Sequence, residues 1–147
     1  MFNNGEKRLM EIVKKVYECF SFESGGKPNF DDLRKLFIAN GLMINNKGEA
    51  PQVRTLPEYE SFIIHNIELG NIISILEVEI DQKFEQYGKV ANIASEYELT
   101  FESPAGKQTR YGVNVFQLVK CENDWLISSM SWDDALQKGK ISCTKGA

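Results

Sequence analysis

The chain has 147 residues, the usual length of one domain, and can bury a sizeable core without disulfides or a metal. Its composition, 42% hydrophobic and 26% charged, is typical of a soluble globular protein, and no apolar run approaches the ~20 residues of a membrane-spanning helix. The net charge of −4 disfavours nucleic acid as a partner, and 3 cysteines without a recognisable signal peptide predict a reducing, cytoplasmic location.

Two helices and a short strand are predicted in the first third of the chain. Apolar residues spaced three or four apart predict a helix over Glu6–Phe20. After a glycine-rich loop, Asn29 can cap a second helix, Phe30–Phe37, and Leu42–Asn45 then has the pattern of a short strand. Each helix has one apolar side, so both are expected to pack against a sheet.

The third helix has the clearest start signal in the chain. Thr55-Leu56-Pro57-Glu58 has the spacing of a capping box, and its proline lies in the first turn, where a missing N–H costs nothing. Gly70 is expected to end the helix in the left-handed conformation that glycine adopts readily. Local signals therefore bound this helix at both ends.

Four strands joined by short turns are predicted between Ile72 and Trp132. Apolar and polar residues alternate along the first strand, and Gly88 follows it in a turn that favours a positive φ. The turns are too close together for an intervening helix, which predicts antiparallel neighbours. The four predicted strands are Leu76–Phe84, Val90–Phe101, Arg110–Lys120 and Trp125–Trp132.

The alternation also predicts which side chains of the first of these strands face the core. Leu76, Val78 and Ile80 share one parity and are expected to be buried. The acidic residues of the opposite parity, expected to form a solvated or dimer-facing stripe, are Glu77, Glu79 and Asp81. They are spaced about 7 Å apart by the strand rise, so we predict no metal site there. The sequence predicts no cofactor either.

Together these elements predict an α+β fold, with N-terminal helices packed in the concave face of a strongly curved antiparallel sheet. Curling the sheet around the long first helix leaves a cone with an opening at one end. Residues 1–147 are expected to form a single domain with a core of about residues 6–134 and a mobile tail, 135–147.

The order of elements resembles that of the nuclear transport factor two-like superfamily, which includes ketosteroid isomerase-like and SnoaL-like proteins. The resemblance also rests on Leu36-Phe37 before Leu42-Met43-Ile44, and on Trp125-Leu126-Ile127 through Met130-Ser131-Trp132-Asp133. It implies the cone-shaped, cystatin-like fold over about residues 6–134. It also implies a small apolar ligand in the cone and a homodimer formed through the outer face of the sheet.

The resemblance implies specific positions for acid–base groups inside the cone. In the isomerases, a carboxylate on the short strand acts as the base, and that position falls near Asn45, whose amide cannot accept a proton. A family tyrosine on the first helix corresponds approximately to Tyr17. A protonated carboxylic acid of the sheet has no clear counterpart here, and Asn114 is the nearest polar candidate.

Three residues are the catalytic candidates, and each also has a structural interpretation. Tyr17 is a core or a catalytic tyrosine. His65, the only histidine, is the natural general acid or base but fits a surface position beside the apolar stripe of its helix. Asp133 follows the last strand and is either a solvated residue or a carboxylate whose pKa an apolar cone mouth would raise.

The candidate ligand-binding residues are large or polar side chains expected to face inward, and the same residue types can instead fill the core. They are Phe20, Phe37, Asn45, Phe62, Tyr97, Asn114, Phe116, Met130 and Trp132. A hollow cone predicts a small-molecule-binding protein or an enzyme that uses acid–base chemistry on an apolar or cyclic substrate, in the manner of an isomerase, cyclase or hydratase. A filled cone predicts a non-catalytic homodimeric interaction module.

A homodimer is a separate prediction. The outer face of the last two predicted strands carries more apolar residues than is usual for a face exposed to solvent. These residues are Val113, Val115, Val119 and Trp125.

Overall fold

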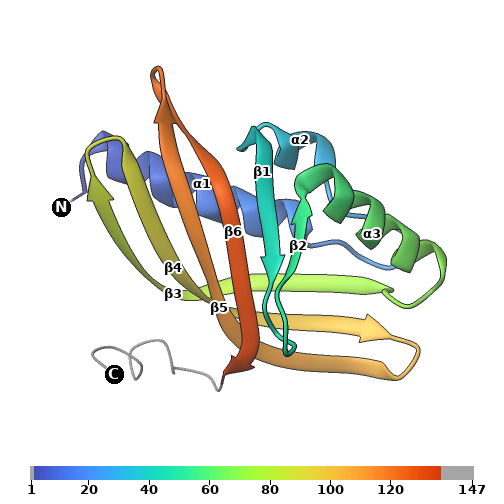
Figure 1. Ribbon diagram of the computed structural model, residues 1–147. Helices are drawn as coiled ribbons and strands as arrows, with labels where there is room; N and C mark the ends of the chain where they lie inside the picture. Colours follow the sequence, from blue (N-terminus) through green and yellow to red (C-terminus); the bar gives the residue numbers. More distant parts are fainter. Residues whose placement is uncertain (1, 137–147) are drawn as a thin grey trace.

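The computed structural model describes residues 2–136, in which three helices cover the concave side of a curved six-stranded sheet (Figure 1). The elements in chain order are α1 (Asn4–Phe20), α2 (Phe30–Arg34), β1 (Phe37–Asn45), β2 (Gln52–Thr55), α3 (Leu56–Glu68), β3 (Ser74–Tyr87), β4 (Val90–Ser103), β5 (Gly106–Cys121) and β6 (Asp124–Leu136). The predicted α+β architecture is confirmed. The predicted mobile tail falls mainly on residues 137–147, which lie outside the described residues.

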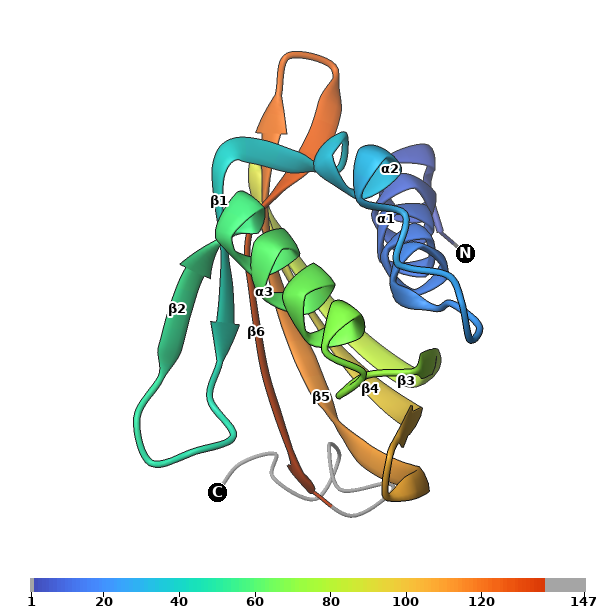
Figure 2. The same cartoon turned by 90° about the vertical axis from the view of Figure 1, so that its right-hand side faces the viewer.

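The strand order across the sheet is β2-β1-β6-β5-β4-β3. The predicted meander, β3 to β6, pairs antiparallel throughout, and β1 joins it by parallel pairing with β6. Figure 2 shows the three helices on the same side of the sheet. No helix within residues 2–136 is long and apolar enough to cross a membrane.

The local signals for the helices are confirmed. The hydroxyl of Thr55 accepts a hydrogen bond from the N–H of Glu58 (3.3 Å), and the Glu58 carboxylate accepts one from the N–H of Thr55 (2.7 Å). Asn29 caps α2 by accepting the N–H of Asp32 at 3.1 Å. Gly70, two residues after the end of α3, has a φ of 79°. The two N-termini form because a side chain satisfies backbone donors that the first turn leaves free.

Two boundaries near the start of the sheet differ from the prediction. The second helix ends at Arg34, and β1 begins at Phe37 instead of Leu42. The N–H of Ile127 donates to the carbonyl of Leu36, and Phe37 pairs with Ile127. The chain from Leu36 onward therefore pairs with β6 and does not continue the helix. The sequence analysis missed β2 (Gln52–Thr55). This short strand forms by antiparallel pairing with β1, and its own residues show little alternation of buried and exposed positions.

The prediction for the faces of β3 is wrong for its first half. Leu76 and Val78 are 56% and 41% exposed, while Glu77 faces the inside. The register shifts between Glu79 and Asp81, so Ile80 is an extra residue that reverses the face of everything before it. Phe84, which has the same parity but follows the shift, packs against the core.

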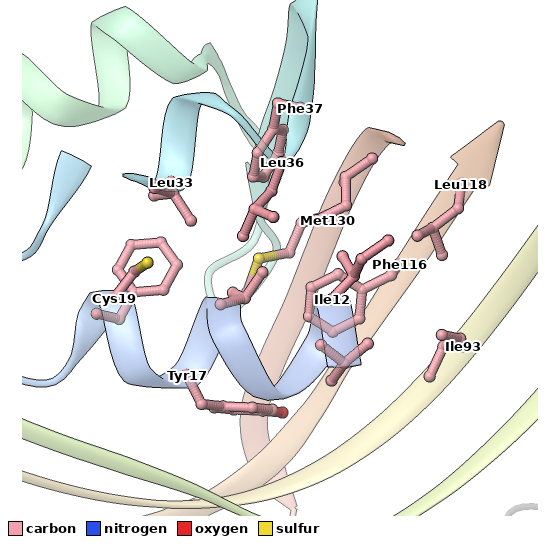
Figure 3. Close-up of a cluster of buried hydrophobic side chains, with 14 of the residues drawn as sticks. Ile12, Tyr17, Cys19, Leu33, Leu36, Phe37, Ile93, Phe116, Leu118 and Met130 are labelled. Atoms are coloured by element: carbon pink, nitrogen blue, oxygen red, sulfur yellow. The ribbon is translucent and has the colours of Figure 1, made fainter. Parts of the chain in front are cut away.

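The core lies between α1 and the concave face of the sheet. Figure 3 shows part of it, with side chains of α1 facing those of the sheet strands. Trp125 belongs to this core, with only 2% exposed, so its predicted place on the outer face is wrong. A second register shift, between Gln117 and Leu118, leaves Ser128 as the extra residue and turns Trp125 inward.

Candidate functional site

A cavity of about 220 Å³ lies inside the cone, between α3 and the inner face of the sheet. Its wall is mainly apolar and aromatic, and its polar groups are few. The apolar lining includes Phe20, Met43, Tyr59, Phe62, Ile63, Ile72, Ile75, Tyr97, Leu99, Phe101, Met130 and Trp132. The polar lining includes Asn45, Lys47, Glu77, Arg110, Asn114 and Asp134. Small-molecule sites have this composition, an apolar wall with a few placed polar groups.

Glu77 is the central titratable group of the cavity. It lies on β3 directly opposite Leu99 of β4, and both line the cavity. Desolvation raises the pKa of Glu77 from 4.5 to about 7, the negative charge of Asp134 adds to this rise, and a hydrogen bond from Asn114 opposes it. Near neutral pH, Glu77 therefore exists in both protonation states.

A chain of hydrogen bonds connects Glu77 to α1. The buried amide of Asn114 donates from Nδ2 to Glu77 Oε2 (3.4 Å) and to the hydroxyl oxygen of Tyr17 (3.1 Å). The Tyr17 hydroxyl lies 2.6 Å from Ser95 Oγ, and Ser95 donates its proton to Glu79. Since Ser95 has one proton to donate, Tyr17 must donate to Ser95. The network therefore holds the Asn114 amide with one N–H toward Glu77 and the other toward Tyr17.

Tyr17 is part of this support and not of the cavity wall. The residue is only 4% exposed, and its hydroxyl group bonds both Asn114 and Ser95. Burial raises the pKa of Tyr17, so the phenol stays protonated and acts as a donor.

A charged cluster of Lys47, Arg110 and Asp134 marks the mouth of the cavity. Lys47 Nζ lies 3.6 Å and Arg110 Nη1 3.5 Å from the same oxygen of Asp134. The Asp134 side chain is 7% exposed, whereas the two basic side chains are 36% and 43% exposed. The carboxylate is thus held inside the mouth, with the two cations between it and solvent.

Gly112 permits the close packing of β5 and β6 beside this mouth. A Cβ at Gly112 would come within 3.0 Å of the backbone of Asp133 and Asp134 and of the Tyr97 hydroxyl. The adjacent register shift, between Tyr111 and Val113, accommodates an additional residue of β6 at this point. A side chain at position 112 would push Asp134 out of place.

The structure brings seven of the nine predicted ligand-binding residues to the cavity. Phe20, Asn45, Phe62, Tyr97, Asn114, Met130 and Trp132 all line it. Phe37 and Phe116 instead belong to the buried core, with 5% and 0% exposed.

None of the three catalytic candidates lines the cavity: Tyr17 is buried behind it, and the other two lie away from it. His65 is exposed on α3. Asp133 lies on β6 beside a shallow depression on the opposite side of the sheet, together with Val113 and Val115. Strand alternation explains the difference, because Trp132 and Asp134 face inward and Asp133, between them, faces outward.

Sequence analysis missed Glu77, Asp134 and Tyr59. Asp134 could have been found, since it lies two residues after Trp132 on the same parity. Tyr59 could also have been found, because it lies one helical turn before Phe62 and Ile63, on the apolar side of the third helix. Glu77 could not, because the register shift at Ile80 places it inside. No cluster of three metal-ligating side chains occurs within the part of the chain that the structure describes.

Solved structures share this architecture at low sequence identity. An ntf2-like protein with a cystatin-like fold from Novosphingobium aromaticivorans superposes with a TM-score of 0.68 and 9% identity, over 97% of this chain and 90% of that one. A "putative aromatic ring hydroxylase" from the same organism gives 0.72 and 14%, over 89% of both chains. A "putative scytalone dehydratase", also from N. aromaticivorans, gives 0.67 and 10%, over 90% and 88%. No protein-family model and no curated protein matches the sequence. At such identities, the likeness shows a common fold.

Proposed function

We propose that this chain, which has the cystatin-like cone fold of the nuclear transport factor two-like proteins, is an acid–base catalyst acting on a small, largely apolar molecule. Glu77 is the group that accepts and returns the proton. One observation carries the proposal: a carboxyl group whose pKa is raised to about 7 lines an apolar cavity of about 220 Å³.

The pKa of Glu77 suits proton transfer in both directions. A group whose pKa lies near the working pH is ionised often enough to take a proton and holds it weakly enough to give it back. The aromatic wall, with Tyr59, Tyr97 and Trp132, keeps the carboxyl desolvated and provides flat surfaces for a ring. The Asn114 amide stabilises the carboxylate form without neutralising it.

The reactions that fit are proton removal from carbon beside a carbonyl or hydroxyl-bearing centre, as in isomerisation, cyclisation or dehydration. Two of the solved structures with this fold are named after a hydroxylase and a dehydratase, which is compatible with small-molecule chemistry. The alternative, a filled cone that serves only protein interaction, is disfavoured by the cavity itself.

A small planar probe tests the proposal without knowledge of the natural substrate. 5-Nitrobenzisoxazole opens when a base removes the proton from its C3 carbon; the N–O bond breaks, and its electron pair remains on the phenolate oxygen. We expect the protein to accelerate this reaction, with a rate that rises with pH around a midpoint of about 7, the pKa of Glu77. Two results would contradict the proposal: a rate equal to that in buffer without protein, or a pH profile with its midpoint near 4.5, as expected for catalysis by ordinary exposed carboxylates.

We also propose that the outer face of the sheet pairs with a second copy of the chain. Val90 is 49% exposed and lies directly opposite Val119, while Val115 is half-buried on the same face of β5. Covering these side chains would remove apolar surface from water on both copies.

Sedimentation at micromolar concentration is expected to give the mass of a dimer, and Val115→Glu to give that of a monomer. Ser24→Glu, in the exposed loop after α1, is the control that adds the same charge elsewhere. A monomeric wild-type protein would rule the dimer out.

A further inference from the structure

The mouth of the cavity has an excess of positive charge. Lys47 and Arg110 share one carboxylate, Asp134, and both contacts are 3.5 Å or longer, beyond a tight charged hydrogen bond. A lysine and an arginine together carry eight N–H donors, far more than one distant carboxylate can satisfy. The mouth therefore offers donors and about one net positive charge toward the cavity.

The protein positions both basic residues at the cavity. Asn45 Oδ1 accepts the backbone N–H of Lys47 at 3.0 Å, which fixes the loop residue at the cavity edge. The Arg110 guanidinium lies 5.0 Å from the ring centroid of Phe101, itself a wall residue, and donates to Gln108 at 3.2 Å. A guanidinium fixed on an aromatic face loses little further freedom when it binds an anion.

The cavity is thus polarised along its length. Lys47 and Arg110 stand at its solvent edge, aromatic rings form its middle, and Glu77 faces it from β3, backed by Asn114 and Tyr17. A ligand that is apolar throughout would leave the donors at the mouth facing only water and Asp134. A ligand with one anionic end would satisfy them.

We infer that the substrate class of this site is small, flat acids: molecules whose single carboxylate binds between Lys47 and Arg110 while their ring lies among Tyr59, Tyr97 and Trp132. The inference rests on the proposed function, since it places the rest of the molecule against Glu77. Asp134 sets the selectivity, because its charge lets the two cations accept one anion and disfavours a second.

Two probes of the same shape test the inference: 2-naphthoate, which is ionised at pH 6, and the neutral 2-naphthamide. Isothermal titration calorimetry of the wild-type protein is expected to give a dissociation constant at least tenfold lower for the carboxylate, since hydrogen bonds to charged groups are the stronger ones. The double variant K47Q/R110Q is expected to bind both probes within about twofold of each other and to keep the amide affinity.

The matched control, K89Q/K120Q, also removes two positive charges from exposed positions. Lys89 lies just before β4 and Lys120 near the end of β5, at the opposite end of this strand pair from Arg110. It is expected to keep the preference for the carboxylate. A preference that survives K47Q/R110Q, or is lost equally in the control, overturns the assignment of these two residues.

The remaining outcomes separate this inference from the function on which it rests. Equal binding of both probes to the wild-type protein overturns the acid-binding mouth and leaves the role of Glu77 standing if the benzisoxazole reaction still has its midpoint near pH 7. Binding of neither probe, together with no benzisoxazole reaction, overturns both.

Discussion

Glu77→Gln is expected to lower the rate of 5-nitrobenzisoxazole opening at pH 8 by about 100- to 10,000-fold, the usual range for loss of a general base. Glutamine has the same shape and can still accept the hydrogen bond from Asn114 that Glu77 accepts at 3.4 Å. It cannot take up the proton. Initial rates measured across pH 5–9 should therefore be much lower, and the pH profile should no longer show a midpoint near 7.

Two variants show whether the loss belongs to Glu77. Glu49→Gln removes a carboxylate from the exposed loop between β1 and β2, and His65→Ala removes the only histidine, which lies on the exposed side of α3. Neither residue lines the cavity, so both variants are expected to keep the wild-type rate within about twofold, as surface changes commonly do. A loss of less than tenfold in Glu77→Gln, or a large loss in His65→Ala, would move the base elsewhere.

The architecture was predictable because its signals are local. The capping box at Thr55, the positive φ at Gly88 and the alternation of Ile93, Tyr97 and Leu99 each depend on a few neighbouring residues. Local propensity and pattern agree with the final fold at these positions. Parallel pairing of β1 with β6 joins segments about ninety residues apart, and no local pattern reports it.

The site was less predictable because two extra residues each reverse part of a strand. The hairpin register set by Tyr87 opposite Val90, continued without interruption, would place Glu77 opposite Thr100 on the outer face. The extra residue Ile80 places it opposite Leu99 instead, inside the cone. A one-residue shift moves every preceding side chain to the other face, and sequence alternation alone cannot reveal it.

Ser128 has the same effect in β6. It allows Trp125 to enter the core at one end of the strand while Trp132 faces the cavity at the other, although the two differ in parity. A strand without the extra residue would have put one of these tryptophans outside. The predicted and observed sites therefore share most of the apolar wall but differ in the carboxylates, which depend on these shifts.

Glu77→Gln is also expected to stabilise the folded protein at pH 8, by at most about 3.5 kcal/mol. Each pKa unit corresponds to about 1.4 kcal/mol, and folding raises the pKa of Glu77 from 4.5 to about 7. The folded state therefore binds this proton more tightly than the unfolded state. The wild-type free energy of unfolding should fall as pH rises from about 4.5 to 7 and change no further above that range on account of Glu77.

Urea unfolding at pH 5 and pH 8 measures this directly. The gain of the variant over the wild type should be small at pH 5, where the wild-type loss has only begun, and much larger at pH 8, whereas Glu49→Gln should follow the wild type at both. A variant that is equally or less stable at pH 8 would mean that Glu77 is not held desolvated. A variant that gains stability and loses the benzisoxazole reaction would show that the fold keeps a destabilising carboxyl in the cone because proton transfer requires it.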